Sequence, residues 1–161
     1  MGGGEVVGTV TFEKTTYAPL PMKFEAGTQN FASAATLKPA IEVANELNDN
    51  KLVENLDSIR DYLLDYFRKD ERIRLYGVPR GTNEEKIPLF SFSVKDVHHE
   101  DLALILDKMG IAVRSGQMCA EPLMDRFGVT GMLRVSFAPY NTLAEAEYFV
   151  KCLNKAIDML V

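Results

Sequence analysis

The chain has 161 residues, of which 47% are apolar and 25% charged, and its formal net charge is -5. That length favours one domain and leaves room for a second small piece, and the composition is typical of a soluble globular protein. An acidic balance without a basic tract argues against a nucleic-acid binder, and no apolar run is long enough to span a membrane. Two cysteines, Cys119 and Cys152, make neither a disulfide framework nor a metal quartet, so we expect a reducing, cytoplasmic location.

The first thirty residues differ from the rest of the chain. Residues 6–12 are rich in β-branched side chains and predict a strand. Residues 15–24 contain Pro19 and Pro21 and predict an extended arm rather than regular structure. Such an arm has little core of its own, so we expect it to pack on another domain or on another subunit.

Two helical patterns and a short strand follow. Residues 31–47 predict a helix in which Pro39 either causes a kink or stands in the first turn of a restarted helix. Residues 51–67 predict the most regular helix, because apolar side chains recur at three- and four-residue spacing. They are Leu52, Leu56, Ile59, Leu63 and Phe67. Residues 73–76 predict a short strand, and residues 78–86 predict a polar loop.

The remaining patterns alternate between strand and helix. Residues 87–94 predict a strand, and the helix after it ends at Gly110, which suits a left-handed C-cap. Short strands are predicted at 111–114 and 132–137, and a final amphipathic helix at 143–160. The order predicts an α+β fold: a small, mostly antiparallel sheet covered by helices on one face, with an N-terminal extended arm.

Cys119 is the first candidate for chemistry. It lies on a Gly-containing loop, five residues after Arg114 and just before a predicted helix start. A thiol near an arginine and a helix N-terminus ionises more easily, and the thiolate is the nucleophile. A buried structural cysteine is the alternative for Cys119. For Cys152, inside the final helix, packing is the favoured interpretation.

Arg134 is the second candidate. It interrupts an otherwise apolar strand, where a guanidinium is costly unless it meets an anion. Its planar fork of donors suits a carboxylate. By strand alternation alone, Arg134 could equally point outward from a half-exposed strand.

Three other features give weaker signals. His98 and His99 have no third ligand nearby, so we expect no metal site and interpret both as solvent-facing or capping residues. The glycines at 2–4 lack the spacing of a phosphate-binding loop. Residues 26–30 precede a helix, where their donors could hold a phosphate or form an N-cap cluster.

The segment 114–124, RSGQMCAEPLM, resembles the active-site loop of group II (Suf-type) cysteine desulfurases, in the class V aminotransferase group of fold-type I pyridoxal phosphate enzymes. Further motifs resemble that family in the same order along the chain. They are the Gly-rich turn at 2–5, F-E-x-G-T at 24–28, the strand at 110–114, R-x-S at 134–136 and Y-N-T at 140–142. The resemblance covers essentially all 161 residues.

The resemblance implies a role for each candidate residue. Cys119 corresponds to the nucleophile that takes sulfur from the substrate as a persulfide. Arg134 corresponds to the anchor for the substrate carboxylate, and Arg114 to a second arginine lining the pocket. Gly27 and Thr28 correspond to cofactor phosphate contacts that one subunit lends to its neighbour.

The same resemblance implies an activity and a domain plan. The parent enzyme would convert L-cysteine to L-alanine with pyridoxal 5'-phosphate and deliver persulfide sulfur to a Suf-type acceptor protein for iron–sulfur cluster assembly. It would be a homodimer. Residues 1–30 would belong to the large domain and the dimer interface, and residues 31–161 would form the C-terminal small domain.

Two departures from the family pattern qualify these implications. Gln117 and Met118 replace the histidine that usually precedes the cysteine, so the resemblance does not extend to a proton relay through that side chain. The family's cofactor-binding lysine, the aspartate facing the pyridine nitrogen and the ring-stacking histidine all lie upstream of the Gly-rich turn. We therefore expect a truncation, a proteolytic fragment or a gene remnant that is inactive alone. The alternatives are a fragment of a selenocysteine lyase and a non-catalytic sulfur-carrier or dimerisation domain.

Overall fold

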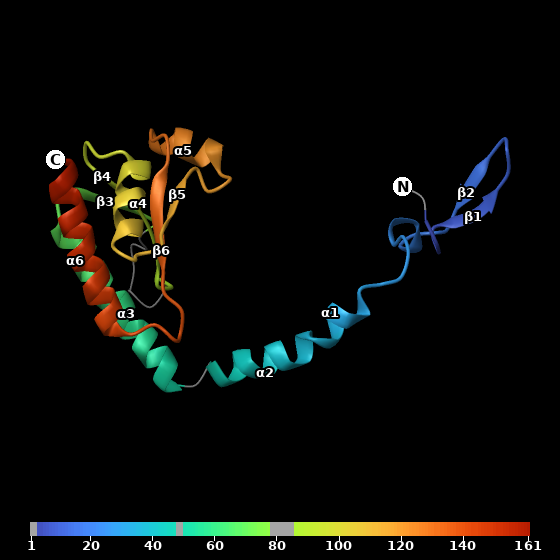
Figure 1. Ribbon diagram of the computed structural model, residues 1–161, viewed down its shortest axis with the longest axis horizontal. Helices are drawn as coiled ribbons and strands as arrows, with labels where there is room; N and C mark the ends of the chain where they lie inside the picture. Colours follow the sequence, from blue (N-terminus) through green and yellow to red (C-terminus); the bar gives the residue numbers. More distant parts are fainter. Residues whose placement is uncertain (1–2, 48–49, 78–85) are drawn as a thin grey trace. The chain divides into compact units, whose positions relative to one another are not determined.

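The computed structural model describes residues 3–47, 50–77 and 86–161 (Figure 1). The chain divides into two compact units, Met1–Glu46 and Leu47–Val161, and each is described by itself. The predicted polar loop at 78–86 lies outside the described residues, except for Lys86. No helix in the described part of the chain is both long and apolar enough to cross a membrane.

The first unit begins with an antiparallel hairpin of β1 (Val7–Val10) and β2 (Thr15–Tyr17). A short 3-10 helix, η1 (Met22–Phe24), follows it. Residues 15–24 are thus more regular than the sequence predicted. The reason is local, because the Thr16 hydroxyl on β2 accepts a hydrogen bond from the Thr9 amide at 2.8 Å and closes the hairpin.

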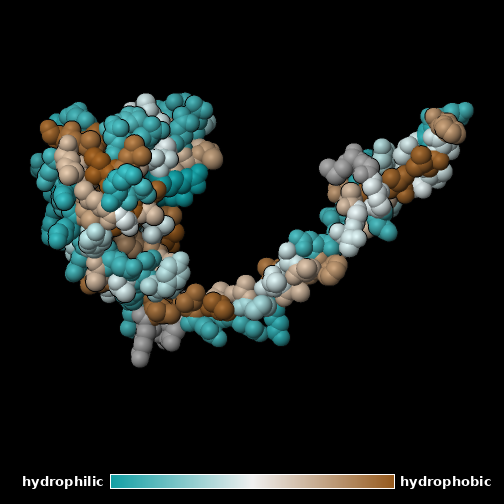
Figure 2. Space-filling model, in the orientation of Figure 1, coloured by the Kyte–Doolittle hydropathy of each residue, from teal (hydrophilic) through white to brown (hydrophobic). Residues whose placement is uncertain are grey.

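Two helices complete this unit, α1 (Phe31–Ala35) and α2 (Leu37–Leu47). Pro39 lies in the first turn of α2, which confirms the predicted restart of the helix. Among the described residues of the unit only Val6 is buried, and apolar atoms are visible on the surface of α2 and of the hairpin (Figure 2). The unit therefore has little core of its own.

The second unit is a four-stranded antiparallel sheet in the order β3-β4-β6-β5. The strands are β3 (Ile73–Tyr76), β4 (Leu89–Val94), β5 (Arg114–Gly116) and β6 (Met132–Ser136). The helices are α3 (Asn50–Lys69), α4 (His99–Lys108), α5 (Glu121–Phe127) and α6 (Leu143–Leu160). This architecture confirms the predicted fold class.

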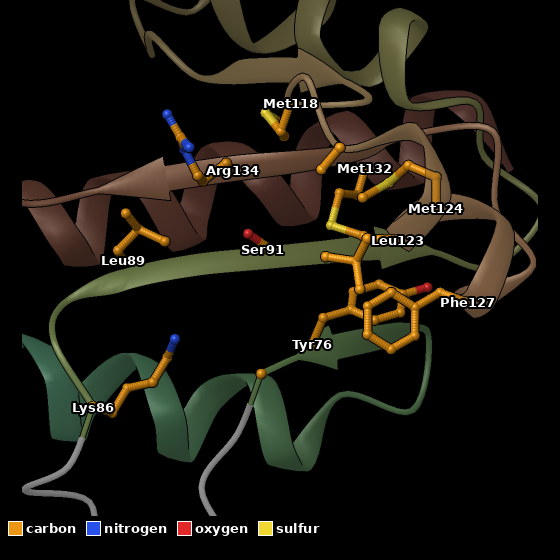
Figure 3. A pocket seen from close by; sticks show the side chains of 12 residues that line it. Tyr76, Lys86, Leu89, Ser91, Met118, Leu123, Met124, Phe127, Met132 and Arg134 are labelled. Carbon is orange, nitrogen blue, oxygen red and sulfur yellow. The ribbon is translucent and has the colours of Figure 1, made fainter.

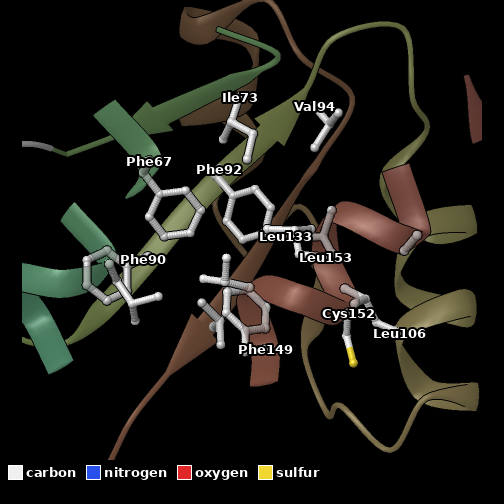
Figure 4. Packing of buried hydrophobic residues seen from close by; sticks show 14 of the residues in the cluster. Phe67, Ile73, Phe90, Phe92, Val94, Leu106, Leu133, Phe149, Cys152 and Leu153 are labelled. Atoms are coloured by element: carbon white, nitrogen blue, oxygen red, sulfur yellow. The ribbon is translucent and has the colours of Figure 1, made fainter. Parts of the chain in front are cut away.

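Alternation along the strands separates the two faces of the sheet. Phe90, Phe92 and Val94 of β4 are buried, whereas the residues between them are half-buried. Together with side chains from β6 they pack on α3, α4 and α6, and Phe67, Phe92 and Phe149 lie at the centre of this core (Figure 4). The opposite face of the sheet is left for other contacts, and the candidate site lies there.

The strand β5 begins at Arg114, the residue where the sequence predicted a strand to end. Gly110 has φ 78°, and the amide of Ile111 still bonds to the Leu106 carbonyl of α4 at 3.0 Å. Residues immediately after Gly110 therefore belong to the helix C-cap. Pairing with β6, which sets Arg114 opposite Arg134, starts only afterwards.

Candidate functional site

A row of paired residues crosses the whole sheet. Tyr76 lies opposite Ser91, Ser91 opposite Arg134, and Arg134 opposite Arg114. Directly opposed residues in antiparallel strands project to the same face. The sheet register thus places the two candidate arginines side by side on the face that the large helices do not cover.

A cavity of about 320 Å³ lies over this face, between the sheet and α5 (Figure 3). Most of its wall is apolar, with Met118, Leu123 and Phe127 among the lining residues. Half-buried Arg134 also lines it, and the structure gives this guanidinium no ion-pair partner among the described residues. A free guanidinium in an apolar cavity is well suited to bind a carboxylate. Arg134 therefore lies on the half-exposed face of the sheet, where it lines this cavity.

The cysteine loop lies between β5 and α5. Cys119 is exposed, and the Arg114 Nη2 donates to its Sγ over 3.8 Å. Gln117 Nε2 donates to Glu121 Oε1 at 3.3 Å, which ties the loop to the first turn of α5. The buried structural alternative for Cys119 is thereby excluded, whereas Cys152 is buried in α6 as predicted.

The backbone of this loop is strained at two consecutive residues. Met118 and Cys119 have φ 57° and φ 58°, the left-handed region that side chains disfavour by about 1–2 kcal/mol per residue. Met118 and Ala120 line the cavity, whereas the thiol between them contacts Arg114. Strain of this kind clusters at functional sites, where surrounding structure imposes it. Gly116 in the sequence indicated a turn there, but no sequence signal located the strain.

Gly27 and Thr28 belong to the first unit, so the structure does not place them relative to the arginines. Gly27 has φ 80°, and its amide donates to the Gly4 carbonyl at 2.9 Å. Thr28 is exposed, and no described residue bonds to its hydroxyl or its amide. Asn30 caps α1 by accepting from the Ser33 amide at 3.2 Å, which confirms the N-cap cluster.

The two histidines take different places. His98 caps α4, accepting a hydrogen bond from the Glu100 amide at 3.4 Å. His99 is buried and is not the cap of α4, so the interpretation of His99 as a solvent-facing or capping residue is wrong. Its ring packs against Gly131, at the place that a Cβ on that residue would occupy. Burial, together with the neighbouring His98, lowers the pKa of His99. In the described residues no three His, Cys, Asp or Glu side chains gather as a set of metal ligands.

Comparison with known proteins places these features in context. The family model for aminotransferase class-V matches residues 1–149. A probable cysteine desulfurase of Vibrio cholerae is 40% identical over 99% of this chain and 38% of its own length. The cysteine desulfurase CsdA of Escherichia coli is 35% identical over 100% of this chain and 39% of its own length. The chain thus spans about two-fifths of the length of these relatives.

Solved structures give the same result. The crystal structure of CsdA in its S-sulfonic acid form superposes with a TM-score of 0.79, covering 100% of this chain and 39% of that one. The apo structure of a cysteine desulfurase from Thermococcus onnurineus superposes with a TM-score of 0.75 at 30% identity, covering 99% of this chain and 39% of that one.

Proposed function

Because the chain belongs to the aminotransferase class-V family, we propose that it is the C-terminal part of a cysteine desulfurase. Such an enzyme converts L-cysteine to L-alanine and passes the sulfur on as a persulfide for iron–sulfur cluster assembly. The observation that carries the proposal is the arrangement of three side chains. Arg114 and Arg134 are paired across β5 and β6, and Arg114 contacts the exposed thiol of Cys119.

Cys119 is the sulfur acceptor in this proposal. Its thiolate attacks the sulfur of the substrate, so that an S–S bond forms while the substrate's C–S bond breaks. The electron pair of the broken bond goes to the substrate carbon, which gains a proton and leaves as L-alanine. The contact with the Arg114 guanidinium and the exposure of the thiol support this role, because a persulfide must afterwards be reached by an acceptor.

Arg134 binds the carboxylate of L-cysteine. A bidentate pair between guanidinium and carboxylate fixes both the position and the rotation of the substrate. The largely apolar lining of the cavity strengthens that pair, because its effective dielectric constant is lower than that of water. Arg114, the next residue in the row across the sheet, adds positive charge between this carboxylate site and the thiol.

Pyridoxal 5'-phosphate, when bound, supplies the electron sink for this chemistry. The turn at residues 27–28 fits its phosphate. At Gly27 no atom lies within 4 Å of the place that a Cβ would take, and Thr28 offers a hydroxyl and an amide without partners among the described residues. Thr28 is thus the direct contact, while Gly27 shapes the turn, because its own amide is bonded to Gly4.

The proposal extends to assembly and domain plan. The parent enzyme is a homodimer in which residues 1–30 belong to the large domain and the dimer interface, and residues 31–161 form the small domain. Residues 27–28 then serve the neighbouring subunit's cofactor. A Suf-type acceptor and a cytoplasmic location remain predictions from the sequence.

A chimaera tests the proposed function. The C-terminal 39% of the Escherichia coli desulfurase, the part that this chain matches, is replaced by the 161 residues, and alanine release from L-cysteine is measured. We expect turnover by the chimaera, and none after Cys119→Ala. Cofactor absorbance, equal in both proteins, verifies the fold. A chimaera that retains cofactor absorbance without releasing alanine would contradict the proposal.

A further inference from the structure

Ser91 is the central polar residue of the cavity floor. It lies directly opposite Arg134 in the pairing of β4 with β6, so both side chains project to the same face and line the same cavity. Ser93, two residues further along β4, also projects to this face. The Ser93 hydroxyl is paired with the Tyr76 hydroxyl at 3.0 Å, whereas no described residue bonds to the hydroxyl of Ser91. Among the described residues, Ser93 thus has a partner for its hydroxyl, whereas Ser91, beside Arg134, has none.

Lys86 supplies a second cation to the same cavity. In Figure 3, Ser91 lies on β4 between Lys86 and Arg134. The ammonium group lies 5.6 Å from the centre of the Phe90 ring, and the described residues include no ion-pair partner for it. Burial lowers the pKa of Lys86, as expected for a cation that is partly desolvated and forms no ion pair with a described residue.

The described residues that line this cavity carry an unbalanced charge. They include an arginine and a lysine but neither aspartate nor glutamate. Positive charge in a largely apolar cavity is costly unless an anion offsets it. A ligand with a carboxylate and a short apolar body complements the two cations, the free hydroxyl and the methionine-rich wall.

We propose that Ser91 and Lys86 complete a carboxylate-binding site with Arg134. Two N–H groups on one edge of the Arg134 guanidinium donate to the two carboxylate oxygens. The Ser91 hydroxyl donates to a remaining lone pair on one of these oxygens. Lys86 acts over a longer distance, as a charge that attracts and holds the anion. Naming that anion as L-cysteine rests on the proposed function, whereas the binding of a small carboxylate does not.

Titration of the chain itself with propionate tests the role of Ser91. Chemical shifts of backbone amides in ¹H–¹⁵N spectra report both where the probe binds and whether the protein is folded, and propionamide is the uncharged control. Ser91→Thr and Ser91→Val form the matched pair, because threonine and valine have the same shape and differ by the hydroxyl. We expect Ser91→Val to bind propionate roughly tenfold more weakly than Ser91→Thr, since a hydrogen bond to a charged group is lost.

Lys86→Met tests the second cation, and Lys108→Met on α4 is its control, because Lys108 lies in the helical layer. We expect Lys86→Met to weaken propionate binding roughly threefold or more at low salt, with the difference shrinking as salt screens the charge. Lys108→Met should bind as the unsubstituted chain does.

Equal affinity of Ser91→Thr and Ser91→Val, no effect of Lys86→Met, or equal shifts with propionamide would overturn the inference. The outcome is independent of the chimaera. If propionate binding depends on Ser91 and Lys86, the inference holds even when the chimaera is inactive. If Ser91→Thr and Ser91→Val bind propionate equally, the inference fails even when the chimaera is active.

Discussion

At the scale of single residues, the two cysteines are the same side chain in opposite surroundings. Cys119 is exposed beside Arg114, and Cys152 is 5% exposed inside α6. We expect iodoacetamide to modify Cys119 in the folded chain and to leave Cys152 unmodified, as peptide mass spectrometry would reveal.

In the chimaera, Cys119→Ser should abolish sulfur loading. Cys152→Ala should leave loading intact and cost at most about 1–3 kcal/mol of stability through lost packing. Equal loading after Cys119→Ser would remove Cys119 from the reaction.

Substitution of Arg134 distinguishes a substrate-binding residue from a surface residue, because replacement of a surface residue would leave the KM for L-cysteine unchanged. An ammonium group cannot reproduce the guanidinium fork, so Arg134→Lys should weaken substrate binding although the charge is kept. The loss of a charge-assisted pair costs about 1.5–3 kcal/mol, hence roughly a ten- to hundredfold rise in the KM for L-cysteine. Cofactor absorbance of the chimaera should not change. An unaltered KM would show that this guanidinium does not hold the substrate.

His99 makes stability depend on pH. Burial and the adjacent His98 lower the pKa of His99 below its ordinary 6.5, so the unfolded chain takes up this proton more readily than the folded chain. The contribution of His99 is therefore fully present above pH 6.5 and is lost as the pH falls below that value. Urea unfolding at about pH 7.5 and about pH 5.5 measures the difference. His99→Gln should reduce that difference, and an equal pH dependence in the variant would refute this role.

At the scale of elements, the contact between α4 and the start of β6 requires a glycine. A Cβ on Gly131 would lie 2.8 Å from the His99 Cδ2 atom, too close for the ring to remain in place. We expect Gly131→Ala to destabilise the chain by about 1–3 kcal/mol, the usual cost of overpacking. In the His99→Ala background, Gly131→Ala should cost less stability than it does in the unsubstituted chain, because the ring that the new Cβ would meet is gone. Additive losses in urea unfolding would indicate that the two residues do not compete for space.

The short strand β5 shows how far local pattern predicts an element. The sequence predicted a strand at 111–114, yet pairing begins at Arg114, because Gly110 and Ile111 still complete the C-cap of α4. Apolar, β-branched residues near a glycine indicate that a strand is close. Its first residue depends on the partner strand β6, and the partner is distant in sequence.

At the scale of the whole molecule, the chain matches 38% to 39% of the length of its desulfurase relatives. We predict that these 161 residues alone bind pyridoxal 5'-phosphate weakly and do not turn over L-cysteine, because the rest of such an enzyme has no counterpart among them. Visible absorbance of the purified chain after incubation with the cofactor, and a sulfide assay, test this directly. Stoichiometric cofactor absorbance together with sulfide release would contradict it and favour a self-sufficient enzyme.

The sequence by itself predicted most of the helices and strands and the family. Periodicity, Pro39 in a first turn and Gly110 at a helix end are local signals, since each reflects steric limits or hydrogen bonds within a few residues. They predicted the α+β fold. The loop and strand placement of Cys119 and Arg134 made these two residues candidates, and the family resemblance added Arg114.

Only the tertiary structure decided how those residues meet. The register of β4, β5 and β6 aligns Ser91 with the two arginines, and it depends on pairing and packing between segments far apart in the chain. The left-handed backbone at Met118 and Cys119 was likewise not predictable from the sequence, because neither residue type favours it. Local preferences therefore predicted which elements form, whereas long-range pairing decided which side chains share the cavity.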